Sequence, residues 1–328
     1  MMMTLLVAAT AGCASALMFA SIVSGALVSL LLFYLAPLPL MVASMGWGPS
    51  CAAIGGALAG ASLGHMFGPP YSAAFVLAVA LPAWWLGRLV LLGRPAADAP
   101  PQETQRTGAA LPPVDWYPLG RILIWIACFA ALTTAAMLFT LGSNASTITD
   151  TLRRGLMHIV DVQDAASRGR TSELVDAFVA IIPAGAATIA MTTLTLNLWL
   201  AAKVTATSGL LRRPWPDIKA TTLPPMMLVA TALAISLCFV GGLPAMLAQI
   251  VTACLMMMYA LMGFAVLHTI TLTLQNRALW LGSVYAVVLL FFFWPIIAVI
   301  SIGIADAVWG IRQRYLARHM LPPLAPKS

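Results

Sequence analysis

Residues 1–87 contain no Asp, Glu, Lys or Arg, and Arg88 is the first residue of these types in the chain. A water-facing surface needs charged side chains, so an uncharged run of this length is very rare in a soluble protein. The run is also apolar, and Gly and Pro interrupt it. It therefore predicts helices inside a lipid bilayer, joined by turns too short to carry charge.

The composition of the whole chain gives the fold class. Its 328 residues are 61% hydrophobic and 8% charged, whereas soluble domains carry roughly 25% charged residues. The apolar stretches are long and lack the alternation of barrel strands, which favours helices. We expect an all-α, polytopic transmembrane helical bundle with eight or nine spans and one extramembrane amphipathic helix.

Apolar runs bounded by Gly, Pro or charge mark the candidate spans. They cover residues 3–23, 26–45, 50–67, 72–93, 119–141, 178–203, 224–240, 244–267 and 279–307. We divide the chain into an uncharged four-span N-terminal module (1–93), a Pro-rich loop expected to be flexible (94–118), a C-terminal membrane module (119–310) and a basic tail (311–328).

Residues 142–177 carry acids and bases in nearly equal number. Ile148, Leu152, Leu156 and Ile159 recur there at helical spacing. This pattern predicts an amphipathic helix that lies on the membrane or caps the bundle. A solvated connecting helix explains the pattern equally well.

The net charge of +7 comes from bases in the connecting segments, where they set orientation, so no nucleic-acid partner is expected. By the positive-inside rule, the loops 94–118 and 203–222 and the tail are cytoplasmic, and segment 142–177 lies outside. Three spans after residue 222 would instead place the tail outside. A re-entrant segment, either 224–240 or 279–310, would remove this conflict.

Small residues recur on two of the predicted helices. Gly56, Gly60 and Gly64 repeat at intervals of four, and Gly12 and Ala16 form a shorter version. Such a face lets a second helix approach closely. We predict helix packing here, with docking of a membrane partner subunit as the alternative.

Few polar side chains fall in apolar segments, and those that do are the candidates for a solute site. They are His65, Asn197, His268 and Asp306. Asp306 lies six residues before Arg312, which favours an ion pair or a helix-end position over catalysis. For Asn197, a hydrogen bond between helices is favoured over a substrate contact.

Motifs of catalysis and of cofactor binding are missing from the sequence. It contains no H-E-x-x-H, Walker A or G-x-G-x-x-G pattern, so we predict no catalytic residue, no metal ligand and no cofactor. The five cysteines lie in apolar segments without C-x-x-C spacing and are interpreted as packing residues.

Several strings occur together in a fixed order: Leu35-Ala-Pro-Leu-Pro39, Gly46-Trp-Gly48, Arg213-Pro-Trp-Pro-Asp217, Gly263-Phe-Ala-Val-Leu-His268 and Gly303-Ile-Ala-Asp306. In that order the chain resembles the YybS-like family of bacterial multi-span membrane proteins. That family is distantly similar to the substrate-binding S components of energy-coupling-factor transporters. The resemblance implies a small molecule bound within a helical bundle and a coupling subunit docked on small residues, such as Gly12 and Ala16 or Gly56, Gly60 and Gly64.

The leading hypothesis for function is a transporter-like protein that binds or moves a small solute, with or without a partner subunit. The main alternative is a non-catalytic assembly or scaffold factor that works through the Pro-rich loop and segment 142–177. A lipid-modifying enzyme is a third hypothesis, because Arg153 and Arg154 could attract anionic headgroups, but no catalytic pair accompanies them.

Overall fold

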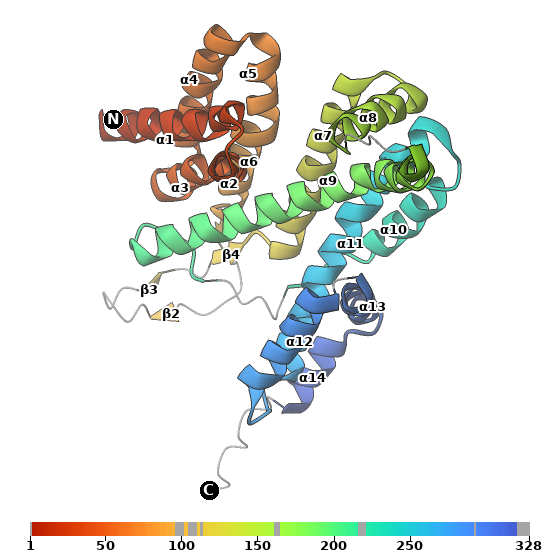
Figure 1. Cartoon of the computed structure of the whole chain (residues 1–328). Helices are drawn as coiled ribbons and strands as arrows, with labels where there is room; N and C mark the ends of the chain where they lie inside the picture. Colours follow the sequence, from red (N-terminus) through yellow and green to blue (C-terminus); the bar gives the residue numbers. More distant parts are fainter. Residues whose placement is uncertain are drawn as a thin grey trace, which may run out of the picture. The chain divides into compact units, whose positions relative to one another are not determined.

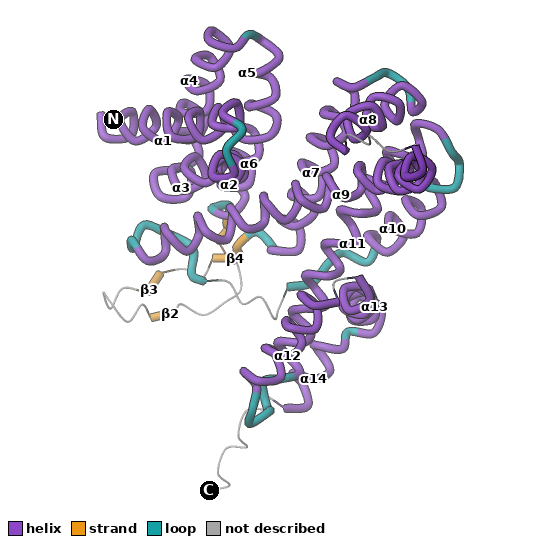
Figure 2. The backbone as a smooth tube through the Cα atoms, in the orientation of Figure 1, coloured by secondary structure: helices purple, strands orange, loops and turns teal. Residues whose placement is uncertain are grey.

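The computed structural model describes residues 2–95, 102–103, 110–111, 114–160, 165–215, 221–291 and 293–319. Helices make up nearly all of these residues (Figure 2). Seven helical stretches are long and apolar enough to cross a membrane, or up to eight if one bent pair counts as a single span. The prediction of an all-α polytopic bundle is confirmed, and the protein is an integral membrane protein.

The chain forms two compact units. Unit 1 consists of Met1–Phe129 and Thr192–Pro216, and unit 2 consists of Ala130–Met191 and Asp217–Ser328. Two of the three boundaries fall within long helices, α7 (Leu119–Leu141) and α9 (Ala165–Thr207). The predicted N-terminal module lies within unit 1, which also takes in the C-terminal part of α9.

The N-terminal part of unit 1 is a bundle of four apolar helical stretches (Figure 1). Their elements are α1 (Met2–Ala20), η1 (Ser21–Ser24), α2 (Leu27–Leu35), α3 (Pro37–Trp47), α4 (Pro49–Phe67), α5 (Pro69–Phe75), η2 (Val76–Ala80) and α6 (Leu81–Val90). The turns before α4 and α5 have the same Gly-Pro structure. Gly48 and Gly68 have positive φ, and each is followed by the proline that starts the next helix, a position that suits proline because its missing N–H is not needed there.

The glycine face predicted on residues 56–64 packs within the chain. A Cβ atom on Gly56 would lie 2.9 Å from the Cβ of Ala80, and one on Gly60 would lie 3.1 Å from Val76. Gly64 is similarly close to Ser72. This is the helix-packing use that the spacing predicts, and α5 and η2 cover the face.

The Pro-rich loop is closed at its base, which the expectation of a flexible segment did not include. Strands β1 (Gly93–Pro95) and β4 (Val114–Trp116) pair antiparallel, with Gly93 opposite Trp116. A second two-residue pair joins β2 (Gln102–Glu103) to β3 (Ala110–Leu111). Residues 96–101, 104–109 and 112–113 of the predicted loop lie outside the described residues.

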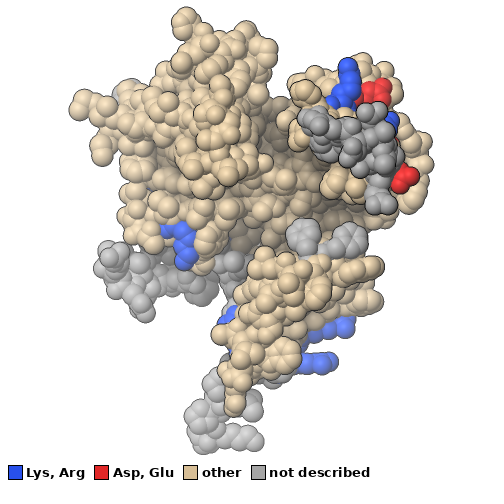
Figure 3. All heavy atoms as spheres, in the orientation of Figure 1, with Lys and Arg blue, Asp and Glu red and all other residues tan. Residues whose placement is uncertain are grey.

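The amphipathic segment predicted for residues 142–177 is divided between two helices. Helix α8 (Ala145–Val160) buries Ile148 and exposes Arg153, Arg154 and Ile159, so its predicted apolar face is confirmed only at its start. Charged side chains gather over α8 in Figure 3. Residues 161–164 are outside the described part of the chain, and α9 then runs for 43 residues, about 65 Å at 1.5 Å per residue.

The remaining helices of unit 2 correct the last predicted spans. Helix α10 (Met226–Leu237) has 12 residues, and its length of about 18 Å falls short of a hydrocarbon core of about 30 Å. Helix α11 (Gly242–Ile270) is long enough to cross. The run predicted as one span at 279–307 contains two helices, α12 (Arg277–Phe291) and α13 (Phe293–Trp309), and α14 (Ile311–His319) follows.

Candidate functional site

The candidate site lies at a sharp bend between α13 and α14, which we call the elbow. The two helices meet at 71°. Gly310 occupies the bend with φ of 62°, a left-handed conformation that costs a residue with a Cβ more than it costs glycine. The Gly310 N–H donates to the carbonyl of Asp306 at 2.8 Å, so the last turn of α13 is closed before the chain turns.

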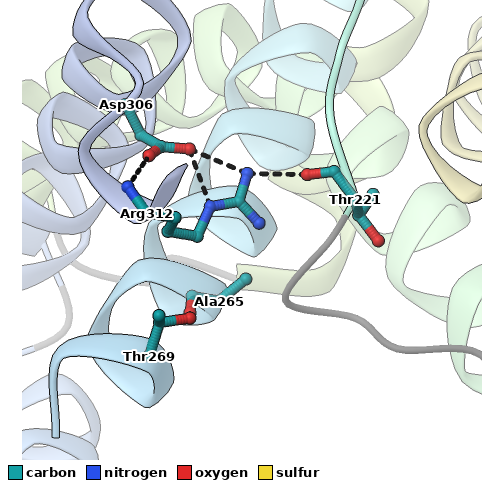
Figure 4. A network of polar contacts seen from close by, with 5 residues as sticks. All are labelled: Thr221, Ala265, Thr269, Asp306 and Arg312. Atoms are coloured by element: carbon teal, nitrogen blue, oxygen red, sulfur yellow. Dashed lines mark hydrogen bonds and ion pairs between the residues drawn. The ribbon is translucent and has the colours of Figure 1, made fainter. Parts of the chain in front are cut away.

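Asp306 and Arg312 form an ion pair across the elbow (Figure 4). Asp306 Oδ2 accepts from Arg312 Nε at 2.8 Å and lies 2.7 Å from Nη2, while Oδ1 accepts from the backbone N–H of Arg312 at 2.8 Å. Arg312 Nη2 also donates to the carbonyl of Thr221 at 2.7 Å. The elbow is therefore tied to the segment that precedes α10.

Burial makes this pair energetically costly. The two side chains are 4% and 6% exposed, and each charge loses several kcal/mol of hydration at such a depth. The bidentate geometry and the backbone partners of Asp306 and Arg312 compensate for that loss. The sequence prediction of an ion pair at Asp306 is therefore correct in its partner, and the structure adds the contact with Thr221.

A cavity of about 360 Å³ opens beside the pair. Asp306 and Arg312 form part of its wall, together with Met262 of α11, Ala307 of α13, and Gln313 and Leu316 of α14. Thr222, Leu223, Gly303 and Gly310 complete the lining. The cavity thus combines apolar walls with an amide, a hydroxyl and an ion pair, and its volume is within the range of about 300–1,000 Å³ typical of small-molecule sites.

Two glycines hold the helices of this site close together. A Cβ on Gly263 of α11 would overlap the carbonyl oxygen of Val299, and a Cβ on Gly303 of α13 would overlap that of Tyr259. Backbones that approach this closely require glycine at both places. The strings Gly263–His268 and Gly303–Asp306 thus lie on two helices that touch each other.

His268 does not join Asp306 in a shared polar site. Its Nε2 is 2.8 Å from the hydroxyl of Tyr285 on α12, and Arg277 Nη2 donates to its backbone carbonyl at 3.4 Å. The Tyr285 ring also stacks on Phe264, with 5.4 Å between the ring centroids. These contacts give His268 a place in the packing of α12 on α11.

Asn197 is fully buried in the part of α9 that belongs to unit 1. Its Nδ2 donates to the carbonyl of Tyr34 at 2.9 Å and to that of Thr193 at 2.8 Å. Tyr34 lies one residue before the end of α2, where carbonyls lack a partner within the helix. Asn197 therefore links α9 to α2, as the packing interpretation predicts.

His65 and the short small-residue pair occupy other parts of unit 1. His65 is exposed in the last turn of α4. A Cβ on Gly12 would overlap the carbonyl oxygen of Gly55, so α1 and α4 cross at this point. Ala16 is partly buried on the same helix. None of these residues lines the elbow cavity.

Sequence reasoning missed Arg213, which is buried outside the spans. Its side chain lies over the ring of Trp116, 5.9 Å from the centroid, and Nη1 donates to the carbonyl of Val90 at 3.4 Å. Burial lowers the pKa of the Arg213 guanidinium below its ordinary value, because desolvation disfavours the charged form. The signal available in the sequence is that Arg213 lies two residues before Trp215.

The elbow presents a carboxylate, a guanidinium, an amide and a hydroxyl, which are groups that can bind a solute. Within the described part of the chain, no group of three or more His, Cys, Asp or Glu side chains is placed to hold a metal ion.

Comparison with known proteins found no matching family model, no similar curated protein and no similar solved structure.

Proposed function

We propose that this integral membrane protein binds a small solute in the elbow cavity and takes part in moving it across the inner membrane of a bacterium, with or without a partner subunit. The observation that carries the proposal is the cavity itself, which has a buried ion pair in its wall at a break between two helices. Helices interrupted beside a cavity are the sites where many transporters hold their substrates.

The cost of the ion pair supports a functional use. An ionised carboxylate and a guanidinium are expensive to bury in a membrane protein, and such groups mark solute pathways more often than they serve packing alone. Here, the pair ties the elbow to Thr221. A solute that enters the cavity would contact a wall whose position depends on these hydrogen bonds.

The lining indicates the kind of solute. Met262, Leu223 and Leu316 offer apolar surface, while Gln313 and Thr222 offer an amide and a hydroxyl. We infer a small molecule with an apolar body and at least one hydrogen-bonding group. Most of the binding free energy would come from the apolar surface, and the polar groups would fix the orientation.

The resemblance to the YybS-like family adds to this proposal. The strings Gly263–His268 and Gly303–Asp306 carry part of that resemblance, and both contribute to the helices of the elbow site. If the chain is a member, the elbow is the region in which a solute site of the family is expected.

A stability screen with a matched pair of variants tests the proposal. Purified protein is unfolded by heat with a library of small metabolites, and ligands that raise Tm are retained. Ala307→Leu fills the cavity, whereas Ala298→Leu adds the same atoms at an exposed position on the same helix, α13. We expect stabilising ligands to lose their effect in the first variant and keep it in the second. Equal responses of both variants would place the binding elsewhere.

The assembly-factor alternative draws on one specific observation. The pairing of β1 with β4 holds the two ends of the Pro-rich loop together, so the loop leaves the membrane edge at a fixed place and could present itself to a partner. Removal of the loop therefore distinguishes an assembly function from solute binding.

A further inference from the structure

The bases of unit 1 that the structure describes occupy a few positions, which we call the basic edge. They lie at the end of α6, in β1, at the start of α7, at the end of α9 and in the segment that follows α9. The bases are Arg88, Arg94, Arg121, Lys203, Arg212 and Arg213. Figure 3 shows Lys or Arg atoms near the C-terminal end of α9, whereas the visible face of α1–α5 is uncharged.

Arg213 is the most buried member of this edge, at 8% exposed. A guanidinium has five N–H donors. The only acceptor for Arg213 among the described residues is the carbonyl of Val90, at 3.4 Å, and its other contact is with the Trp116 ring. A buried arginine without a carboxylate keeps most of its capacity to bind a planar or tetrahedral anion.

Two further bases lie over tryptophan rings close by in the chain. Lys203 Nζ is 4.7 Å from the ring centroid of Trp215, two residues after Arg213. The Arg88 guanidinium is 5.8 Å from that of Trp85, and Arg88 is two residues before Val90. Tryptophan prefers the headgroup layer of a bilayer, so the rings place these bases at the depth of lipid phosphates.

Among the side chains that the structure describes, one acidic group lies near these bases. In unit 1, the one described acidic side chain is Asp115, which lies 3.7 Å from Arg94 Nε and is 60% exposed. The pairs Arg213–Trp116, Lys203–Trp215 and Arg88–Trp85 involve no carboxylate. Among the described side chains, these three bases therefore have no carboxylate partner and could meet an external anion.

We propose that the basic edge binds a phosphate group, with Arg213 as the buried anchor and Lys203 and Arg88 as exposed partners. The anion is the headgroup phosphate of an anionic lipid or a free phosphate. Each base near a membrane surface contributes about a fivefold gain in affinity for anionic lipid. This site does not depend on the elbow cavity or on the solute bound there.

The test uses the purified full-length protein and two sources of phosphate. Binding of phosphatidylglycerol and phosphatidylcholine is compared in nanodiscs of each composition by native mass spectrometry. Stabilisation by inorganic phosphate is compared with that by chloride at equal ionic strength. Lys203→Gln and Arg88→Gln change exposed side chains and preserve the fold, while Arg213→Gln removes the anchor. Arg318→Gln, an exposed base on α14, is the matched control.

We expect phosphatidylglycerol to bind in preference to phosphatidylcholine. Affinity should fall about fivefold in Lys203→Gln and Arg88→Gln, fall further in Arg213→Gln, and stay unchanged in Arg318→Gln. If inorganic phosphate stabilises the wild type but not these three variants, a free phosphate is sufficient for binding. If phosphatidylglycerol binds and inorganic phosphate has no effect, the ligand is the lipid headgroup. Equal binding of both lipids with no effect of phosphate would overturn the proposal, and so would an unchanged affinity in Lys203→Gln.

Discussion

The carbonyl of Thr221 accepts a hydrogen bond from Arg312 Nη2 at 2.7 Å. Thr221 ends the basic segment 203–222, and Arg312 opens the basic tail, so the two segments that the positive-inside rule assigns to the cytoplasm meet at one point. The chain between them must therefore cross the membrane an even number of times or fold back within it. Of the three predicted crossings, residues 244–267 correspond to the long helix α11, whereas α10 is too short to cross.

Cysteine labelling tests this sidedness. In a variant without native cysteines, Ser208→Cys and Ala317→Cys are expected to react with a membrane-impermeant reagent from the same side, because the Thr221–Arg312 bond joins their segments. Ser143→Cys, in the turn between α7 and α8, is expected to react from the opposite side. Labelling of Ser208→Cys and Ala317→Cys from opposite sides would contradict the shared location.

The buried pair should be sensitive to loss of one partner. Asp306→Asn or Arg312→Met leaves an uncompensated buried charge, and we expect the free energy of unfolding in mixed micelles to fall by about 3–5 kcal/mol. The double variant should lose less than the sum of the two, because no lone charge remains.

The exposed pair Arg153–Asp176, at 3.1 Å with side chains 44% and 54% exposed, provides the control for that experiment. Arg153→Gln should cost about 0–1 kcal/mol, since water screens exposed ion pairs. A loss at Asp306 no larger than the loss at Arg153 would show that the elbow pair is hydrated.

The crossing of α11 and α13 predicts a steep cost for one methyl group. Gly303→Ala would overlap the carbonyl oxygen of Tyr259, whereas Gly282→Ala on α12 would meet no atom within 4 Å. We expect Gly303→Ala to lower the free energy of unfolding by about 1–3 kcal/mol through overpacking. Gly282→Ala should be neutral or slightly stabilising. Similar stabilities for both variants would rule out the close crossing.

Deletion of residues 96–112 separates the two candidate functions. Three glycines replace the deleted residues so that β1 and β4 can still form a hairpin, and we expect Tm to change little and solute-dependent stabilisation to persist. Cells that depend on the protein should then retain solute uptake. If the cellular phenotype is lost while solute binding stays intact, the assembly-factor alternative is favoured instead.

Much of the fold follows from hydropathy and turn residues. The runs at 50–67 and 119–141 correspond to α4 and α7 with errors of one residue or none, because Gly-Pro pairs and charged loops leave little freedom at their ends. The run at 26–45 corresponds to the single candidate span Leu27–Trp47, within which Pro37 separates α2 from α3. Apolar composition does not record such a break.

The C-terminal part was harder to predict for a physical reason. A sharp bend between helices leaves the apolar composition unchanged, so the hydropathy of this region does not locate the 71° bend between α13 and α14. The amphipathic pattern of residues 142–177 likewise could not show that α9 begins at Ala165 and continues into the span.

The ion pair of the candidate site could be predicted from the sequence, but the contacts and the cavity around it could not. Asp306 and Arg312 are six positions apart in the sequence, which suggested their contact. Thr221 lies 91 residues from Arg312, and the cavity depends on the elbow at Gly310 and on α14, which local patterns do not place. Arg213 escaped attention because a base in a loop looks solvated until packing against Trp116 is known.

The most direct test of solute binding in the elbow cavity is to identify what the protein carries when purified from its own cells. Small molecules released from the wild type, Ala307→Trp and Ala298→Trp are quantified by mass spectrometry. We predict a molecule that is released from the wild type and Ala298→Trp in equal amounts and is missing from Ala307→Trp, whose indole fills the cavity. An equal amount released from Ala307→Trp would contradict solute binding in the elbow cavity.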